Sequence, residues 1–222
     1  MRSDSLVSNR RLRIALAIAA VLTAPPAESQ VQVVPRVVTE RSLNKIVDNS
    51  ALGSFLVREG FSRINLEQRN LNPRGSKHTA KQLTAAVEVN GLIASMVVDT
   101  GASKTSIARG RLTKFDLSEQ KTNYPAASTF GGLSPSEFVG FVTLNTLGIG
   151  NCLITNLPVH IFNLPRDVDG LLGLDAMRRT GAVIDCADRA LYVTPQAPSS
   201  DTSDRLTTIL RDEGYTSIRV SL

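Results

Sequence analysis

Apolar and polar residues alternate with the period of a β-strand through the middle of the chain. Residues 83–89 alternate, Asn90 and Gly91 form a preferred two-residue hairpin turn, and residues 92–98 are apolar enough for a buried strand. Glycine, asparagine and proline residues separate further segments of this kind, at 138–147, 153–162, 182–184 and 190–194. The pattern therefore predicts many short strands.

One short helix is predicted among these strands, at residues 175–179. Several strands with a single late helix indicate an all-β fold, and we assign it to residues 76–196, a length sufficient for a separate hydrophobic core. The 222-residue chain contains no Trp and is only 5% aromatic, so Val, Leu, Ile and Ala must supply most of that core.

A helix and a strand are predicted directly before this domain. Ser50 is a suitable N-cap, the following residues have the spacing of an amphipathic helix, and Gly60 ends it. Residues 62–66 then alternate like a strand.

The last residues of the chain have the same order of elements. Ser203 or Asp204 is the expected cap, Gly214 ends the helix, and residues 218–222 alternate. Both helices end in a Glu-Gly pair followed by an aromatic residue, which predicts that the tail, residues 197–222, is a partial repeat of residues 50–66.

The N-terminus has the organisation of an export signal. Arginines at positions 10, 11 and 13 precede the apolar run 14–22, and small residues follow as far as Ser29. Because a membrane-spanning helix needs about 20 apolar residues, we expect cleavage near Ser29 rather than a permanent anchor, with the uncleaved anchor as the alternative. Residues 1–29 are thus a predicted signal peptide, residues 30–75 a leader, and the protein is expected to be exported, either periplasmic or secreted.

Composition and charge exclude several classes of protein. The composition is 42% apolar and 20% charged, unlike a disordered chain, a collagen or a polytopic membrane protein. The net charge is +5, but no block of Lys and Arg follows residue 13, so nucleic-acid binding is not expected.

The two cysteines and two histidines do not predict a metal site. Cys152 and Cys186 could form a disulfide after export or remain as two free thiols, and neither has a His or a third Cys close in sequence. His78 and His160 stand far apart without further ligands at metal-binding spacing. We expect no metal and no cofactor.

The chemistry is predicted at Asp99, a carboxylate at the end of an apolar strand. Small residues follow it: Thr100, Gly101, Ala102 and Ser103. The strand fixes the carboxylate, the Thr100 hydroxyl can hold the turn, and Gly101 leaves room for a second carboxylate or a backbone segment. An Asp-Thr-Gly triplet occurs by chance in roughly 5% of chains of this length, so a second motif is needed.

The second motif is the apolar segment 168–175, which contains Leu171, Leu172 and Gly173. Together, DTGAS and DGLLGL resemble the catalytic turn and the supporting loop of the aspartic peptidases. The resemblance covers residues 76–196, and a single catalytic motif in a short chain is similar to the retropepsins, in particular their exported bacterial relatives. It implies a single-lobe acid-protease barrel with one short helix, flanked here by the two helix-strand segments.

The resemblance implies an aspartic endopeptidase that acts on peptides or proteins. One carboxylate must serve as general base for a water while a neighbouring carboxylic acid binds the carbonyl oxygen, so we expect a homodimer with one Asp99 from each chain. Thr100 and Gly101 would hold the two turns together. The terminal strands 64–66 and 218–222 are candidates for pairing between subunits.

A flap over the substrate is expected at the hairpin 129–138, and a plain surface hairpin is the alternative. Its candidate substrate contacts are Phe130, Gly131, Gly132 and Phe138. Viral retropepsins pair an Arg after the supporting Gly with an acid two residues after the catalytic Gly, whereas Leu174 and Ser103 stand here. Lys104 replaces a second viral acid, so substrate preference does not transfer.

A second function from another class is kept as an alternative. The chain could be an exported peptide-binding or assembly protein that retained the barrel and lost hydrolysis. The intact DTGAS turn favours the enzyme.

Overall fold

A computed structural model of the protein describes residues 14–17, 31–36, 50–71, 80–119, 138–164, 167–196, 198–214 and 216–219. For residues 14–17, 80 and 216–219 it describes the backbone alone. The predicted leader and hairpin 129–138 therefore lie partly outside the described residues, as does most of the predicted signal peptide.

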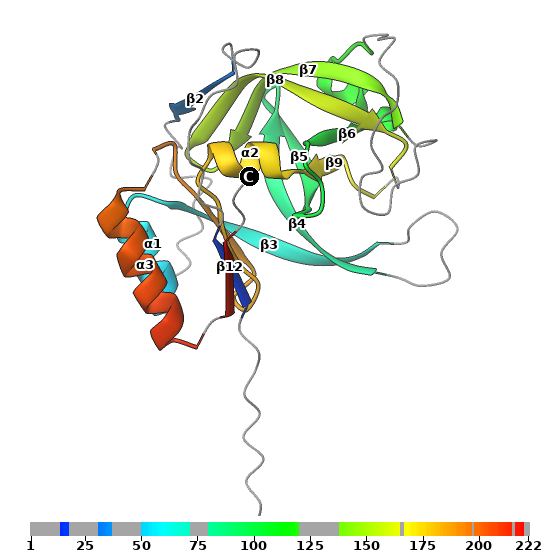
Figure 1. Ribbon diagram of the computed structural model, residues 1–222. Helices are drawn as coiled ribbons and strands as arrows, with labels where there is room; N and C mark the ends of the chain where they lie inside the picture. Colours follow the sequence, from blue (N-terminus) through cyan, green and yellow to red (C-terminus); the bar gives the residue numbers. More distant parts are fainter. Residues whose placement is uncertain are drawn as a thin grey trace, which may run out of the picture.

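The described chain consists mainly of strands (Figure 1). The strands are β1 (Ile14–Ala17), β2 (Gln32–Pro35), β3 (Ser62–Leu71), β4 (Ala80–Val89), β5 (Leu92–Val98), β6 (Ser106–Ala108), β7 (Phe138–Ile149), β8 (Cys152–Phe162), β9 (Gly170–Leu172), β10 (Val183–Asp185), β11 (Ala190–Val193) and β12 (Thr216–Arg219). The helices are α1 (Ala51–Arg58), α2 (Leu174–Arg179) and α3 (Ser200–Asp212), with two 3₁₀ turns, η2 (Arg109–Arg111) and η3 (Thr113–Phe115).

These strands are joined in one hydrogen-bonded sheet. Its order is β12-β1-β10-β11-β3-β4-β5-β9-β6-β8-β2, with β7 paired to β4 and β8. The predicted all-β fold is confirmed, with α2 as the short helix inside the domain and with α1–β3 and α3–β12 as the flanking helix-strand segments.

The β4–β5 hairpin forms as predicted because its turn residues allow it. Asn90 and Gly91 have φ values of 49° and 81°, and a type I′ turn needs positive φ at both positions. Val89 pairs with Leu92, and the register continues to Thr84 and Val97. This hairpin brings the chain to Asp99.

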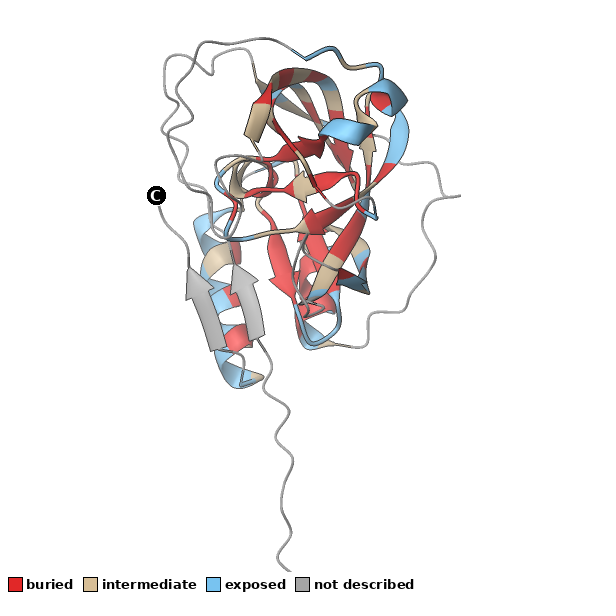
Figure 2. Cartoon of the chain, turned by 90° about the vertical axis from the view of Figure 1, so that its right-hand side faces the viewer, coloured by how far each residue is buried: buried red, intermediate tan, exposed pale blue. Residues whose placement is uncertain are grey.

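The main hydrophobic core includes buried side chains of β4, β5, β7, β8 and α2. Buried residues dominate the strands at the centre of the molecule, as Figure 2 shows. The side chains of this core are almost all aliphatic, as the composition predicts; they include Val87, Met96, Leu144, Ile154 and Met177, each at most 2% exposed. Such burial contributes about 1.5–3 kcal/mol for each large side chain.

A second cluster, which we call the helix cluster, packs α1 and α3 against β10 and β11. Its buried members are Leu52, Phe55, Leu56, Phe61, Val183, Ala190, Tyr192, Leu206 and Leu210. The two helices lie side by side on the outside of the sheet (Figure 1). The helix cluster therefore joins the segment before the barrel to the tail after it.

The N-cap predicted for the last helix is wrong. The cap is Ser199 rather than Ser203 or Asp204, and the helix begins at Ser200. The Ser199 hydroxyl accepts a hydrogen bond of 3.1 Å from the N–H of Thr202. The longer helix places Thr202, Leu206 and Leu210 on one buried face, at a spacing of four residues. The α1 cap is as predicted, since Ser50 Oγ accepts from Gly53 N at 2.9 Å.

The sheet also contains short strands that the sequence pattern did not predict, among them β1, β2 and β6. β2 covers the first part of β8, with Val33 opposite Ile154, while β6 pairs with the last part of β8. β1, which lies in the predicted export signal, pairs with β10 and β12. None of the described helices is long and apolar enough to cross a membrane.

Candidate active site

Asp99 lies directly after β5, and its backbone is held by the strand beside it. β9 runs parallel to β5, pairing Leu172 with Val98, and the N–H of Asp99 donates to the carbonyl of Leu172 at 3.1 Å. The predicted supporting loop and the predicted catalytic turn are thus adjacent, although about 70 residues of sequence separate them. Asp99 is half-buried at this position.

The turn after Asp99 is closed by its own backbone. Gly101 N–H donates to Asp99 Oδ1 at 2.9 Å, and Ala102 N–H donates to the Asp99 carbonyl at 3.3 Å. Ala102 is buried, whereas Thr100, Gly101 and Ser103 are exposed. Among the described residues none forms a hydrogen bond with the Thr100 side chain, so its hydroxyl can bind a group outside this part of the chain.

The supporting loop passes so close to the segment after the turn that two of its positions need glycine. A Cβ on Gly173 would lie 2.6 Å from Thr105 N, and one on Gly170 would overlap the backbone carbonyl oxygen of Ser106. Real Cβ atoms do not approach backbone this closely. Leu174 N–H also donates to the Ala102 carbonyl at 2.8 Å, so turn and loop form one rigid unit.

Asp175 links the same two segments, a role that sequence reasoning missed. Its Oδ1 accepts hydrogen bonds from the N–H and the hydroxyl of Thr105, both at 2.7 Å, and from Ala176 N–H at 2.8 Å. The Thr105 hydroxyl in turn accepts from Gly173 N–H at 3.2 Å. Viral retropepsins have an ion pair at the positions of Leu174 and Ser103, which this chain lacks. The hydrogen bonds of Asp175 lie one residue beyond Leu174. The sequence feature that could have indicated this role is the position of an acidic residue in the first turn of the α2 helix.

Asp169, at the start of the supporting loop, is a second buried carboxylate that the sequence did not single out. It is 6% exposed and accepts from Arg111 Nε, Lys114 Nζ and Ser95 N–H, each at 2.9 Å. These bonds fasten the 3₁₀ turns η2 and η3 to β5 and β9. Because both oxygens have cationic partners, the buried charge is compensated.

The predicted flap is described at one residue only. Phe130, Gly131 and Gly132 lie outside the described residues. Phe138 begins β7, half-buried, and its ring lies edge-on to three others at centroid distances of 5.1–5.6 Å, those of Phe141, His160 and Phe162. Phe138 and Leu171 pack against the same small apolar cluster, so the structure brings this residue to the face that carries the supporting loop.

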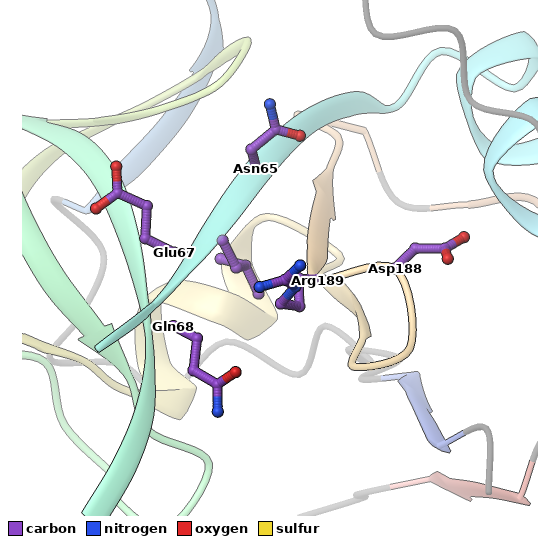
Figure 3. Close-up of a pocket in the computed structure, with 6 residues that line it drawn as sticks. Asn65, Glu67, Gln68, Asp188 and Arg189 are labelled. Carbon is purple, nitrogen blue, oxygen red and sulfur yellow. The ribbon is translucent and has the colours of Figure 1, made fainter. Parts of the chain in front are cut away.

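An open hollow of about 510 Å³ lies elsewhere, beside β3 and the turn between β10 and β11 (Figure 3). Its lining residues are Asn65, Leu66, Glu67, Gln68, Asp188 and Arg189. Asp99 is not among them, and nearly all of these side chains are exposed. We do not assign the hollow to the candidate active site.

The two cysteines are free thiols. Cys152 is buried at the start of β8, and burial raises its pKa to about 12. Cys186 is exposed in the β10–β11 turn, where partial burial and the charge of Asp185 raise its pKa. Within the described parts of the chain, no three His, Cys, Asp or Glu residues are grouped as metal ligands.

Known proteins share the domain that carries both motifs. The sequence model of a family described as aspartyl protease matches residues 85–176, which include Asp99 and the supporting loop. No curated protein matches the chain. The match confirms the resemblance inferred from the motifs.

Two solved structures are similar to the chain. A retropepsin-like aspartic protease from Rickettsia conorii is 22% identical, and the match covers 60% of this chain and 93% of that one, with a TM-score of 0.37. The retroviral protease-like domain of Ddi1 from Leishmania major is 15% identical, with coverage of 52% and 90% and a TM-score of 0.35.

Proposed function

We propose that this protein, whose residues 85–176 match the sequence model of an aspartyl protease family, is a retropepsin-like aspartic endopeptidase that hydrolyses peptide bonds as a homodimer. Asp99 is the catalytic residue. Peptides or proteins are its substrates.

The observation that carries the proposal is the state of the Asp99 turn. The carboxylate is half-buried at the end of a strand, one oxygen is held by Gly101 N–H, and the residues beside it are exposed. Within the described residues no other carboxylate shares a hydrogen bond with Asp99. The site thus offers one rigidly held carboxylate where peptide hydrolysis needs two, which supports completion by a second copy.

The reaction follows from two such carboxylates facing each other. They share one proton because both cannot be ionised at close range. The ionised Asp99 takes a proton from a water, whose oxygen attacks the peptide carbonyl carbon, while the protonated Asp99 gives its proton to the carbonyl oxygen. The resulting diol then breaks its C–N bond: the newly protonated Asp99 gives its proton to the leaving nitrogen, and the other Asp99 takes a hydroxyl proton from the new carboxyl group. Gly101 N–H keeps one carboxylate oxygen in place, which leaves the other to bind the water. The reaction needs one ionised and one protonated Asp99 at the same time, so we expect maximal activity in acid.

The remaining parts have supporting roles in this proposal. Thr100 hydroxyls bind across the two-fold axis, the hairpin 129–138 covers an extended substrate, and the strand predicted at 218–222 pairs between subunits. The strand predicted at 64–66 is not an unpaired edge, because β3 lies between β11 and β4 in the sheet of its own chain, so its predicted pairing between subunits is wrong. Export to the periplasm or the medium is part of the proposal, on the basis of the basic and apolar N-terminus.

Substituting Asp99 tests the catalytic role. Asp99→Asn keeps the size of the side chain and removes the base, so cleavage of a denatured protein at mildly acidic pH should fall by about a hundred- to ten-thousand-fold. Asp116→Asn makes the same change at the exposed C-cap residue that follows η3 and serves as the matched control. Cleavage retained by Asp99→Asn would refute the role.

Mixing the two proteins tests the shared site. If each site needs two Asp99 residues, only a quarter of the dimers in an equal mixture of wild type and Asp99→Asn are active after subunit exchange. The mixture then has about a quarter of the activity of the same total amount of protein that is all wild type. A mixture that retains half shows that chains act singly. Analytical sedimentation measures directly whether the protein is a dimer. A stable dimer that binds peptides without cleaving them supports the peptide-binding alternative.

A further inference from the structure

The register of the sheet places a row of side chains on the face that carries Asp99. Val97 pairs with Leu171, Leu171 with Ser106, Ser106 with His160, and His160 with Phe141. Residues paired across neighbouring strands point to the same face of a sheet. Asp99 follows Val97 by two residues, so it lies on the same side. The row therefore crosses five strands beside the catalytic turn.

The middle of this row is polar, although both of its ends are apolar. Ser106 is 1% exposed, and its hydroxyl has no hydrogen-bond partner among the described residues. Buried hydroxyls nearly always have a partner, and one without a partner reduces stability. This hydroxyl is covered in the single chain, so a ligand can satisfy it once the side chains that cover it move aside.

His160 is the neighbour of Ser106 on this face and is half-buried. Burial lowers its pKa; the negative charge of Asp175 opposes this effect and the positive charge of Lys104 adds to it. At neutral pH the imidazole is therefore uncharged and has one N–H donor and one acceptor nitrogen. Ser106 and His160 together can both donate and accept.

We propose that Ser106 and His160 bind an uncharged hydrogen-bonding side chain of the peptide, the amide of Asn or Gln, and select it over an apolar side chain of the same size. This inference rests on the proposed function, because it assumes that a peptide lies over the Asp99 face. Leu171 and Phe141, on either side, contact the aliphatic part of that side chain.

The surroundings favour an amide over the two other kinds of occupant. An apolar side chain would leave the Ser106 hydroxyl unsatisfied, and sites built to hydrogen-bond reject analogues that lack the polar group. A carboxylate would gain little, because the opposite charges of Lys104 and Asp175 both act on this position. An amide supplies one donor group and one acceptor, which match the pair.

Binding to the Asp99→Asn protein tests this inference without hydrolysis. A fixed peptide is made with Asn, the nearly isosteric Leu, or Asp at each of three positions on either side of a central residue, and affinities are measured by calorimetry at neutral pH. At one position we expect Asn to bind about tenfold more tightly than Leu, the loss for one unsatisfied buried hydroxyl. Ser106→Ala should bring the two affinities together.

Two further variants complete the experiment. Ser203→Ala makes the same change on α3 and should keep the preference for Asn. His160→Leu removes the second polar group and should reduce the preference as well, which keeps the inference testable if Ser106→Ala does not fold.

The outcomes separate this inference from the proposed function. No position that distinguishes Asn from Leu, a preference that survives both Ser106→Ala and His160→Leu, tighter binding of Asp than Asn, or no peptide binding at all would each overturn the inference. Cleavage by the wild type decides the proposed function separately. A protein that prefers Asn but cleaves nothing would retain the inference and lose the enzyme.

Discussion

The Asp99 turn and the helix cluster are held together by different forces. At the turn, backbone groups bond directly across segments, such as Asp99 N–H to Leu172 and Leu174 N–H to Ala102, and Gly173 has no space for a side chain. In the helix cluster, α1 and α3 contact each other and the sheet through buried apolar side chains.

The difference indicates separate tasks. Hydrogen bonds are directional and fix positions to fractions of an ångström, whereas apolar burial is non-directional and mainly adds stability. Changes at the turn should therefore reduce the activity of the folded protein more than they reduce its stability. Changes in the helix cluster should reduce stability and leave the activity of the folded protein intact.

The largest effect is expected for Gly173→Ala. The new Cβ would meet Thr105 N at 2.6 Å, so the loop or the turn must move. A displacement of about 1 Å costs on the order of a hundredfold in rate, and we expect kcat to fall by at least that factor. The control is Gly110→Ala, where a Cβ meets nothing within 4 Å. Steady-state kinetics with full activity in Gly173→Ala would contradict the close packing.

Phe55→Ala should have the largest effect on stability. The ring is 2% exposed in the helix cluster, and Arg205 lies 5.1 Å from its centroid. Truncation should reduce the free energy of unfolding by about 3–5 kcal/mol, measured by urea denaturation. Below the unfolding transition kcat should be unchanged, and a parallel loss of kcat would show that the two regions are coupled. Exposed Val57, 50% accessible on the same helix, gives the control Val57→Ala.

Two substitutions of Asp175 distinguish whether its hydrogen bonds or its charge support the Asp99 turn. Asp175→Ala removes the acceptor of both Thr105 hydrogen bonds. Because these bonds hold the segment after the Asp99 turn in position, we expect kcat to fall about tenfold with KM little changed. Asp175→Asn keeps an acceptor oxygen and should restore most of the activity. Equal losses in the two variants would show that the charge itself is required.

The smallest effect is expected for Ser50→Ala at the start of α1. It removes the hydrogen bond from Gly53 N–H and should cost about 1 kcal/mol of stability. Ser199→Ala makes the same change at the α3 cap and should cost a similar amount. Thermal unfolding measures both, and activity at low temperature should not change in either variant.

Features made by neighbouring residues could be predicted from the sequence. Asn90 and Gly91 specify a hairpin turn, and the Ser50 cap and the apolar spacing behind it specify α1, because these depend on contacts within a few residues. The position of Asp99 at a strand end followed in the same way. The α3 cap was misplaced because several Ser and Asp residues nearby were equally suitable caps.

Features made across the chain could not be predicted. β6 and β9 have three residues each, too few for any periodicity, and they pair with each other in the gap between the longer strands β5 and β8. The partners of Asp175 and Asp169 come from segments 55–74 residues away in sequence. Nothing local distinguishes these acids from those on the surface.

The amino-acid sequence alone determined the local conformations, the all-β character and the motifs of the Asp99 turn and the supporting loop, since these follow from side-chain type and short-range spacing. Only the tertiary structure decided that the supporting loop lies against Asp99, that Asp175 and Thr105 join them, and that Ser106 and His160 share the face beside them. The physical reason is that strand pairing and close backbone contact bring together residues whose separation along the chain carries no local signal.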